Sequence, residues 1–235
     1  MTRGAAACAV ILCLAGCAGG ARESANAGDR YTEYYRRLHP SVVLFTMHIP
    51  ADDPRRKGKY DKAYGSGVVV ESGDWGSRIL TDAHVVADAR DLVVRIGDGK
   101  KAPAHVAAVS SDDEDVAIVD TRIPNAAVAH LGSSKNAEPG RPIGVLGYPI
   151  PDAFEDERLG TTASLYTGRI ASVRKGALEL DVPIIPGESG GPVFDGDTGD
   201  IIGIAESRFE EERAIGFATP IDVAVKFLAA HPRRP

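Results

Sequence analysis

Residues 184–195 read IIPGESGGPVFD, which places Ser189 in a glycine-rich turn that runs into an apolar segment. Gly187, Gly190 and Gly191 permit backbone dihedrals that a Cβ would oppose, so this turn can be tight and can aim its N–H groups inward. A serine hydroxyl is a poor nucleophile until a neighbouring imidazole accepts its proton during attack. Ser189 is therefore a candidate nucleophile if the fold brings a histidine and an acid to it.

Two other stretches offer those partners. Residues 79–86 (ILTDAHVV) place His84 just past a strand-like run, and residues 113–119 (DEDVAIV) place Asp115 at the start of another. An imidazole can act as the base, and an acid on its second nitrogen fixes its tautomer and stabilises the imidazolium. We therefore expect a triad of Ser189, His84 and Asp115.

The site also needs donors for the oxyanion and one acid to orient the histidine. The oxyanion of a tetrahedral intermediate needs backbone N–H donors, and those of Gly187 and Ser189 are the natural ones. Several acids could orient the histidine, but only Asp115 directly precedes the apolar run. The rejected acids are Asp112, Asp113 and Asp120.

Outward from these stretches the chain is a series of short β-branched runs separated by Gly, Asp and Pro, a pattern that predicts sandwiches or barrels. The runs are 42–45, 67–70, 78–80, 92–96, 105–109 and 116–119, then 142–147, 168–173, 177–180, 191–194, 201–205 and 215–218. Residues 132–140 (GSSKNAEPG) are the expected linker between two units.

Helices are expected only near the two ends. Residues 31–38 can form two turns that stop before His39-Pro40, because a residue before proline avoids the α region. Near the C-terminus, Thr219 is the expected N-cap, Pro220 the first helical residue and Asp222 the acid of the first turn. The partly apolar face of this second helix should dock on the second unit.

The chain has 235 residues and a formal net charge of −6, which argues against a nucleic-acid binder, since phosphates are neutralised by Lys and Arg. No group of His, Cys and Asp has metal-ligand spacing along the sequence, so we expect neither a metal nor a cofactor.

The N-terminus carries a targeting signal. A positive start is followed by an apolar run over residues 5–15 that is too short to span a bilayer. It ends in Leu14-Ala15-Gly16-Cys17, which resembles the lipobox of bacterial lipoproteins. We expect a signal peptide over 1–16, a lipid on Cys17 and a tether over 17–39. A plain secretory signal, with Cys17 incidental, is the alternative.

The expected cleavage before Cys17 bears on disulfides, and the residue after Cys17 bears on location. The mature chain would retain no pair of thiols, so its fold would be stabilised without a disulfide. Ala18 after the cysteine resembles lipoproteins passed to the outer membrane, which places the protein in the bacterial envelope, bound to a membrane by its lipid.

The order His, Asp, Ser and the strings TDAHVV, DVAIV and GESGGP resemble the chymotrypsin-fold serine peptidases. The stretches ILTDAHVV, IIPGESGGPVFD and GFATP are most similar to the HtrA/Deg branch. This resemblance implies an all-β domain over 40–231 with two six-stranded antiparallel barrels and the active site between them. Barrel 1 would span about 41–130, barrel 2 about 141–220, and a short C-terminal helix about 220–230.

The same resemblance implies an endopeptidase that acts on polypeptides, misfolded envelope proteins among them. The chain stops soon after the protease unit, so the peptide-binding PDZ domain of full-length HtrA proteins is expected to be absent. Nothing in the sequence indicates an oligomeric state.

The resemblance also locates a specificity pocket. Its base falls at the uncharged Pro183, which favours a modest aliphatic side chain such as Val, Ala or Leu before the scissile bond. Glu206 could contradict this by turning into the pocket and recruiting Lys or Arg. It could instead act beside the triad or point outward. The residues expected to line the pocket are Ile184, Ala205, Glu206, Ser207 and Gly216.

The sequence leaves two other functions open. Glu188 stands where the family usually has Asp or Asn, and together with Glu206 it could spoil the site, which would leave a protease-like binding or chaperone-like lipoprotein. Residues 187–191 also fit G-x-S-x-G, but an esterase would need a helix after the serine and a later catalytic histidine. Here Gly-Pro and a β run follow, and the one later histidine is His231 in a Pro/Arg tail.

Overall fold

The computed structural model describes residues 30–51, 55, 57–111, 113–206 and 215–233. The expected signal peptide, the lipid site at Cys17 and the pocket residue Ser207 lie outside the described residues. Within them, no helix is both long enough and apolar enough to cross a membrane.

The first half of the chain forms a closed antiparallel barrel whose strands follow the order β1-β2-β3-β6-β5-β4. Fully buried aliphatic and aromatic side chains such as Phe45, Ile79 and Val119 fill its interior. The strands are β1 Val42–Pro50, β2 Tyr60–Gly73, β3 Gly76–Thr81, β4 Arg90–Ile96, β5 Lys101–Val109 and β6 Ala117–Thr121.

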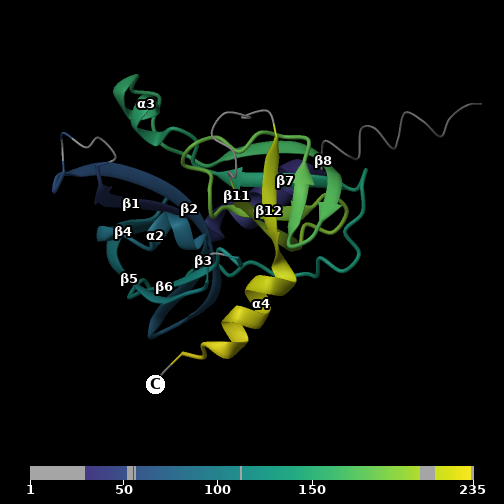
Figure 1. Cartoon of the computed structure of the whole chain (residues 1–235), viewed down its shortest axis with the longest axis horizontal. Coiled ribbons are helices and arrows are strands. Elements are labelled where there is room, and N and C mark those ends of the chain that lie inside the picture. The colour runs from purple at the N-terminus through teal and green to yellow at the C-terminus, as the bar shows by residue number, and fades with distance from the viewer. Residues whose placement is uncertain (1–29, 52–54, 56, 112, 207–214, 234–235) are drawn as a thin grey trace, which may run out of the picture.

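The second half repeats this design with the order β10-β11-β12-β9-β8-β7, again closed, and the two barrels lie beside each other (Figure 1). Its own core includes Ile143, Leu178 and Val193. The strands are β7 Pro142–Gly147, β8 Ser164–Arg174, β9 Ala177–Leu180, β10 Pro192–Asp195, β11 Ile201–Glu206 and β12 Gly216–Pro220. The predicted fold of two six-stranded barrels is confirmed.

A third apolar cluster joins the barrels. It combines Leu80 from barrel 1 with Leu146, Tyr148 and Phe194 from barrel 2, all of them fully buried. A backbone hydrogen bond of 2.8 Å from the Ser66 N–H to the Ser189 carbonyl also crosses the interface. Burial of apolar surface between the barrels therefore fixes one against the other, and the residues at their junction are held by both.

Residues 30–38 are helical, as the sequence predicts, but this helix belongs to the folded domain. Tyr34 and Leu38 are buried, Tyr34 packs edge-on against Phe194 at 5.8 Å, and its hydroxyl donates to the Asp197 carbonyl at 2.6 Å. The expected tether over 17–39 is therefore wrong from residue 30 onward, because these aromatic contacts fix the segment to barrel 2. A short 3-10 helix, η1 (His39–Ser41), leads into β1.

The C-terminal helix α4 (Ile221–Ala230) buries Ile221, Ala224 and Phe227 and packs on β11 and β12, as expected (Figure 1). The prediction of Thr219 as its N-cap is wrong, since Thr219 lies in β12 and its hydroxyl points to Glu206. Asp222 instead accepts hydrogen bonds from the linker, including one of 2.7 Å from the Ser134 hydroxyl. These hydrogen bonds lower the pKa of the Asp222 carboxyl.

Two short helices were not expected from the sequence. Helix α2 (Ala83–Val86) follows β3 directly and carries His84. Helix α3 (Pro151–Asp156) lies in the segment between β7 and β8 (Figure 1). Both are too short to give a periodic apolar pattern.

Candidate active site

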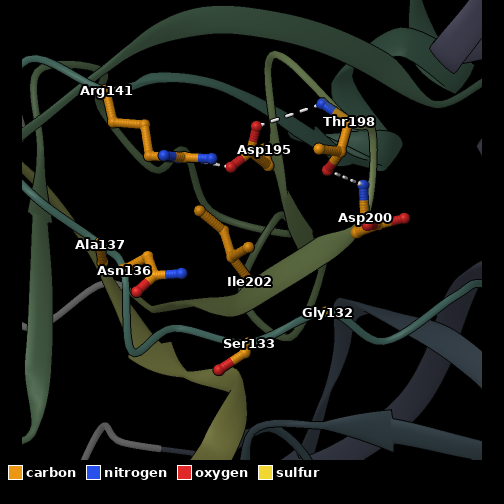
Figure 2. A pocket seen from close by; sticks show the side chains of 9 residues that line it. All are labelled: Gly132, Ser133, Asn136, Ala137, Arg141, Asp195, Thr198, Asp200 and Ile202. Carbon is orange, nitrogen blue, oxygen red and sulfur yellow. Dashed lines mark hydrogen bonds and ion pairs between the residues drawn. The ribbon is translucent and has the colours of Figure 1, made fainter.

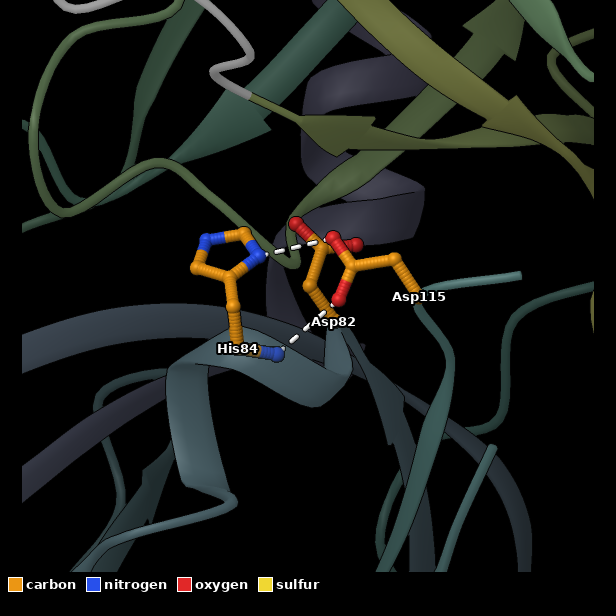
Figure 3. Close-up of side chains that lie close together, drawn as sticks. All are labelled: Asp82, His84 and Asp115. Carbon is orange, nitrogen blue, oxygen red and sulfur yellow. Dashed lines mark hydrogen bonds and ion pairs between the residues drawn. The ribbon is translucent and has the colours of Figure 1, made fainter. Parts of the chain in front are cut away.

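His84 and Asp115 form a pair at the edge of barrel 1 (Figure 3). The Nδ1 atom of His84 lies 2.7 Å from Oδ2 of Asp115, and the backbone N–H of His84 donates to Oδ1 at 2.9 Å. The His84 side chain is 47% exposed and that of Asp115 is 14% exposed. The acid thus holds the imidazole through one ring nitrogen, while the other nitrogen points away from it.

The backbone around Asp115 is adapted to this contact. Asp115 has φ 45°, a left-handed conformation that an L-residue other than glycine adopts rarely and that is often found at functional sites. Burial alone would raise the pKa of its carboxyl. Hydrogen bonds from the His84 ring and from the backbone N–H groups of His84 and Ala83 outweigh burial and leave this pKa below its usual value. The carboxylate is therefore kept ionised beside the imidazole.

A second carboxylate, that of Asp82, lies close to this pair, and the sequence had not singled it out. Asp82 is fully buried, and single ligand atoms of Asp82, His84 and Asp115 lie within 4.8 Å of one another (Figure 3). Spacing along the sequence did not reveal this group, because its three members come together only in the fold. The Nδ1 atom of His84 is bonded to Asp115, so within this group the Asp115 carboxylate holds the imidazole.

The turn that carries Ser189 is clamped to barrel 1. The Ser66 hydroxyl donates to the Gly187 carbonyl at 2.7 Å and accepts from the Tyr148 N–H at 2.9 Å. Gly190 has φ 87°, and a Cβ there would lie 2.1 Å from both the Ser66 carbonyl and the Thr81 hydroxyl. Because Thr81 is three residues before His84, the turn meets barrel 1 beside the segment that carries the histidine.

The N–H groups of this turn divide into two sets. Those of Glu188, Gly190 and Gly191 donate to the carbonyls of Ile185, Ala205 and Glu188, at 2.8–2.9 Å. For the N–H groups of Gly187 and Ser189, no acceptor is found in the part of the chain that the structure describes. Gly187 has φ 98°, a conformation that glycine adopts without strain. These two donors are the pair expected for the oxyanion.

The expected pocket residues that the structure describes lie in barrel 2. Ile184 and Ala205 belong to its apolar core, and a Cβ on Gly216 would lie 2.9 Å from the Ile184 side chain. Glu206 is only 7% exposed, and its carboxylate accepts a hydrogen bond of 3.3 Å from the Thr219 hydroxyl. Of the orientations left open for Glu206, the outward one is therefore wrong.

A cavity of about 160 Å³ lies between barrel 2 and the linker, and Figure 2 shows the residues that line it. Its wall carries an ion pair of Arg141 and Asp195 at 2.5 Å. None of the residues expected for catalysis or specificity lines it. The lining residues are Gly132, Ser133, Asn136, Ala137, Arg141, Asp195, Thr198, Asp200 and Ile202.

The sequence of this chain is similar to those of known serine proteases. A family model described as trypsin-like peptidase domain matches residues 65–204. A probable periplasmic serine endoprotease, DegP-like, from Hahella chejuensis is 30% identical over 84% of this chain and 42% of its own length. The putative serine protease HhoB from Synechocystis sp. is 29% identical over 74% of this chain and 40% of its own length.

Solved structures agree on the fold. The HtrA-type protease AlgW with a tripeptide has a TM-score of 0.68 at 24% identity, over 85% of this chain and 62% of that chain. The serine endoprotease from Yersinia pestis has a TM-score of 0.67 at 26% identity, over 85% of this chain and 65% of that one. The chain spans about two fifths of the length of the curated relatives just named.

Proposed function

Because the chain belongs to the trypsin-like peptidase family, we propose that it is a serine endopeptidase in which Ser189 is the nucleophile. His84 is the general base, and Asp115 orients and stabilises it. The observation that carries this proposal is the 2.7 Å contact between His84 Nδ1 and Asp115 Oδ2, since it leaves the second ring nitrogen available to a serine.

In the proposed reaction the His84 Nε2 takes the proton of the Ser189 hydroxyl as its oxygen attacks the peptide carbonyl carbon. The resulting imidazolium is stabilised by the ionised Asp115 and then protonates the leaving amine. The N–H groups of Gly187 and Ser189, which have no acceptor within the described residues, support their proposed role as donors to the oxyanion. Water, activated by the same histidine, then hydrolyses the acyl-enzyme.

The proposed specificity is for a modest aliphatic residue before the scissile bond. Ile184 and Ala205 are buried and apolar, and Gly216 contributes no side chain. Discrimination is expected to be shallow, since a methylene group in an apolar pocket changes the free energy by only about 1–3 kcal/mol. Glu206 remains the residue that could reverse this preference.

The proposed substrates are polypeptides of the bacterial cell envelope. The relative from Hahella chejuensis is described as periplasmic, and the leader of this chain has the features of an export signal. We place the protein on the extracytoplasmic side of a membrane, held there by a lipid on Cys17. A chain with two or more acyl groups is stably anchored.

A peptide library tests both the activity and the pocket. The wild-type protein should cleave after Val, Ala or Leu, and His84→Ala should lower cleavage by about 10⁶-fold. His130 is a matched control, because its Nδ1 atom lies 3.0 Å from Oδ1 of Asp200 in another, exposed His–Asp pair. His130→Ala should cleave like the wild type.

Two results would count against the proposal. If His84→Ala stayed within tenfold of the wild type, the assignment of the base would be wrong. If cleavage occurred mainly after Lys or Arg, the apolar pocket would be rejected and Glu206 would be its charged floor.

A further inference from the structure

Glu188, the residue directly before Ser189, is fully buried. Its Oε2 accepts a hydrogen bond of 2.8 Å from the Ile185 N–H. Its Oε1 is also buried and has no hydrogen-bond partner among the described residues. The carboxyl group therefore bonds back to the start of its own turn through one oxygen and leaves the other without a donor.

The surroundings of this carboxyl group hold no compensating positive charge within the described residues. Among the described residues, the phenol of Tyr166 on β8 is in electrostatic contact with it, and the pKa of this phenol is raised mainly by burial and further by Glu188. On the β7 side, a Cβ added to Gly147 would lie 3.0 Å from the Glu188 Cα, so the backbones are in close contact there. The turn is packed too tightly for the side chain to reach solvent without moving it.

An ionised Glu188 carboxylate in this buried position has a high free energy. A buried carboxylate is tolerated when a cation or several donors compensate it, and here one N–H serves two oxygens. Burial outweighs the hydrogen bond from Ile185, which lowers the pKa, and the net effect raises the pKa of the Glu188 carboxyl to about 7. The neutral acid and the carboxylate are thus both populated near neutral pH.

We propose that Glu188 is a positioning residue, which holds the turn of Gly187 and Ser189 in its active form only while its carboxyl group is neutral. This inference rests on the proposed function of the turn. In the neutral form, the hydrogen bond from the Ile185 N–H closes residues 185–188 and holds the N–H groups of Gly187 and Ser189 in place. Ionisation places an uncompensated charge under the oxyanion site, and the turn must open to hydrate it.

The proposal gives the enzyme a loss of activity on the alkaline side. Because the same histidine acts in the wild type and in Glu188→Gln, the ratio of their kcat/KM values removes its contribution. Glutamine keeps an oxygen that accepts from Ile185 and cannot ionise. With a midpoint at about 7, the active fraction of the wild type falls about tenfold between pH 6 and pH 8. The ratio of Glu188→Gln to wild type should therefore rise about tenfold over this interval.

Glu157→Gln is the matched control, because Glu157 is exposed and lies outside the turn. Its ratio to the wild type should stay constant from pH 6 to pH 8. If both proteins hydrolyse peptides and the ratio for Glu188→Gln also stays within twofold of constant, the proposal is overturned while the proposed function stands.

A second measurement, urea unfolding, tests the proposal even if the wild-type protein hydrolyses no peptide. A group whose folded pKa is raised contributes stability at low pH that is lost as the pH rises toward that pKa. In urea unfolding, the midpoint of Ser189→Ala should fall between pH 5 and pH 8, whereas that of Ser189→Ala with Glu188→Gln should fall less. Equal pH dependence of the two midpoints would overturn the proposal. If the wild-type protein hydrolysed no peptide but the two midpoints differed in their pH dependence as expected, the neutral Glu188 would be supported and only the proposed function rejected.

Discussion

Gly190→Ala is the substitution that most directly tests how the turn of Ser189 is fixed to barrel 1. The new Cβ would lie 2.1 Å from the Ser66 carbonyl and 2.1 Å from the Thr81 hydroxyl, which are themselves joined by a 2.7 Å hydrogen bond. The φ of 87° adds about 1–2 kcal/mol for a residue with a Cβ. Overpacking of a tight core contact adds about 1–3 kcal/mol more.

The expected loss is therefore about 2–5 kcal/mol of unfolding free energy, or a displaced turn. If the turn moves by about 1 Å, activity should fall by about 10²-fold, because the nucleophile leaves its attack geometry. Urea unfolding measures the first effect and peptide hydrolysis the second.

Gly176→Ala is the control that separates the effect of backbone strain from that of steric overlap. Gly176 has a similar φ of 76° in the turn between β8 and β9, but a Cβ there would meet nothing within 4 Å. This variant should lose about 1–2 kcal/mol through its backbone alone and keep wild-type activity. The reasoning would be refuted if Gly190→Ala lost no more stability than Gly176→Ala and also hydrolysed peptides within twofold of the wild type.

Three other outcomes are expected. Asp115→Asn should lower kcat by about 10⁴-fold through loss of the correct imidazole tautomer, and a drop below tenfold would remove Asp115 from the triad. EDTA should leave peptide hydrolysis unchanged, since His84 Nδ1 is bonded to Asp115 and Asp82 is buried; a loss that Zn²⁺ reverses would instead assign the three residues to a metal. Cys17→Ser should release the protein from membranes into the soluble fraction, whereas an unmodified Cys17 in the mass spectrum of the wild type would reject the lipid.

Much of the fold was predictable because the barrel strands are short, β-branched and separated by Gly, Asp and Pro. The run at 142–147 and the run at 177–180 coincide with β7 and β9 to the residue. The docked helix over residues 30–38 was identified as a helix but not as part of the domain. Its burial depends on Phe194, more than 150 residues away, which local patterns do not report.

In the candidate site, too, some features were predictable from the sequence and others were not. The pairing of His84 with Asp115 followed from the position of each residue beside a strand. Asp82 was missed because helix α2 begins at Ala83, between Asp82 and His84, so the alternation of side chains along a strand does not report how these two side chains lie. The orientation of Glu206 toward Thr219 depends on the pairing of β11 with β12, which the sequence did not reveal.

The central claim, that Ser189 is an activated nucleophile, is tested most directly by a fluorophosphonate probe followed by mass spectrometry of the labelled peptide. The account predicts a single covalent adduct on Ser189 in the folded wild-type protein. It predicts no adduct in Ser189→Ala and a greatly reduced rate of labelling in His84→Ala. Folded wild-type protein that stays unlabelled, or that carries the adduct on another residue, would contradict it.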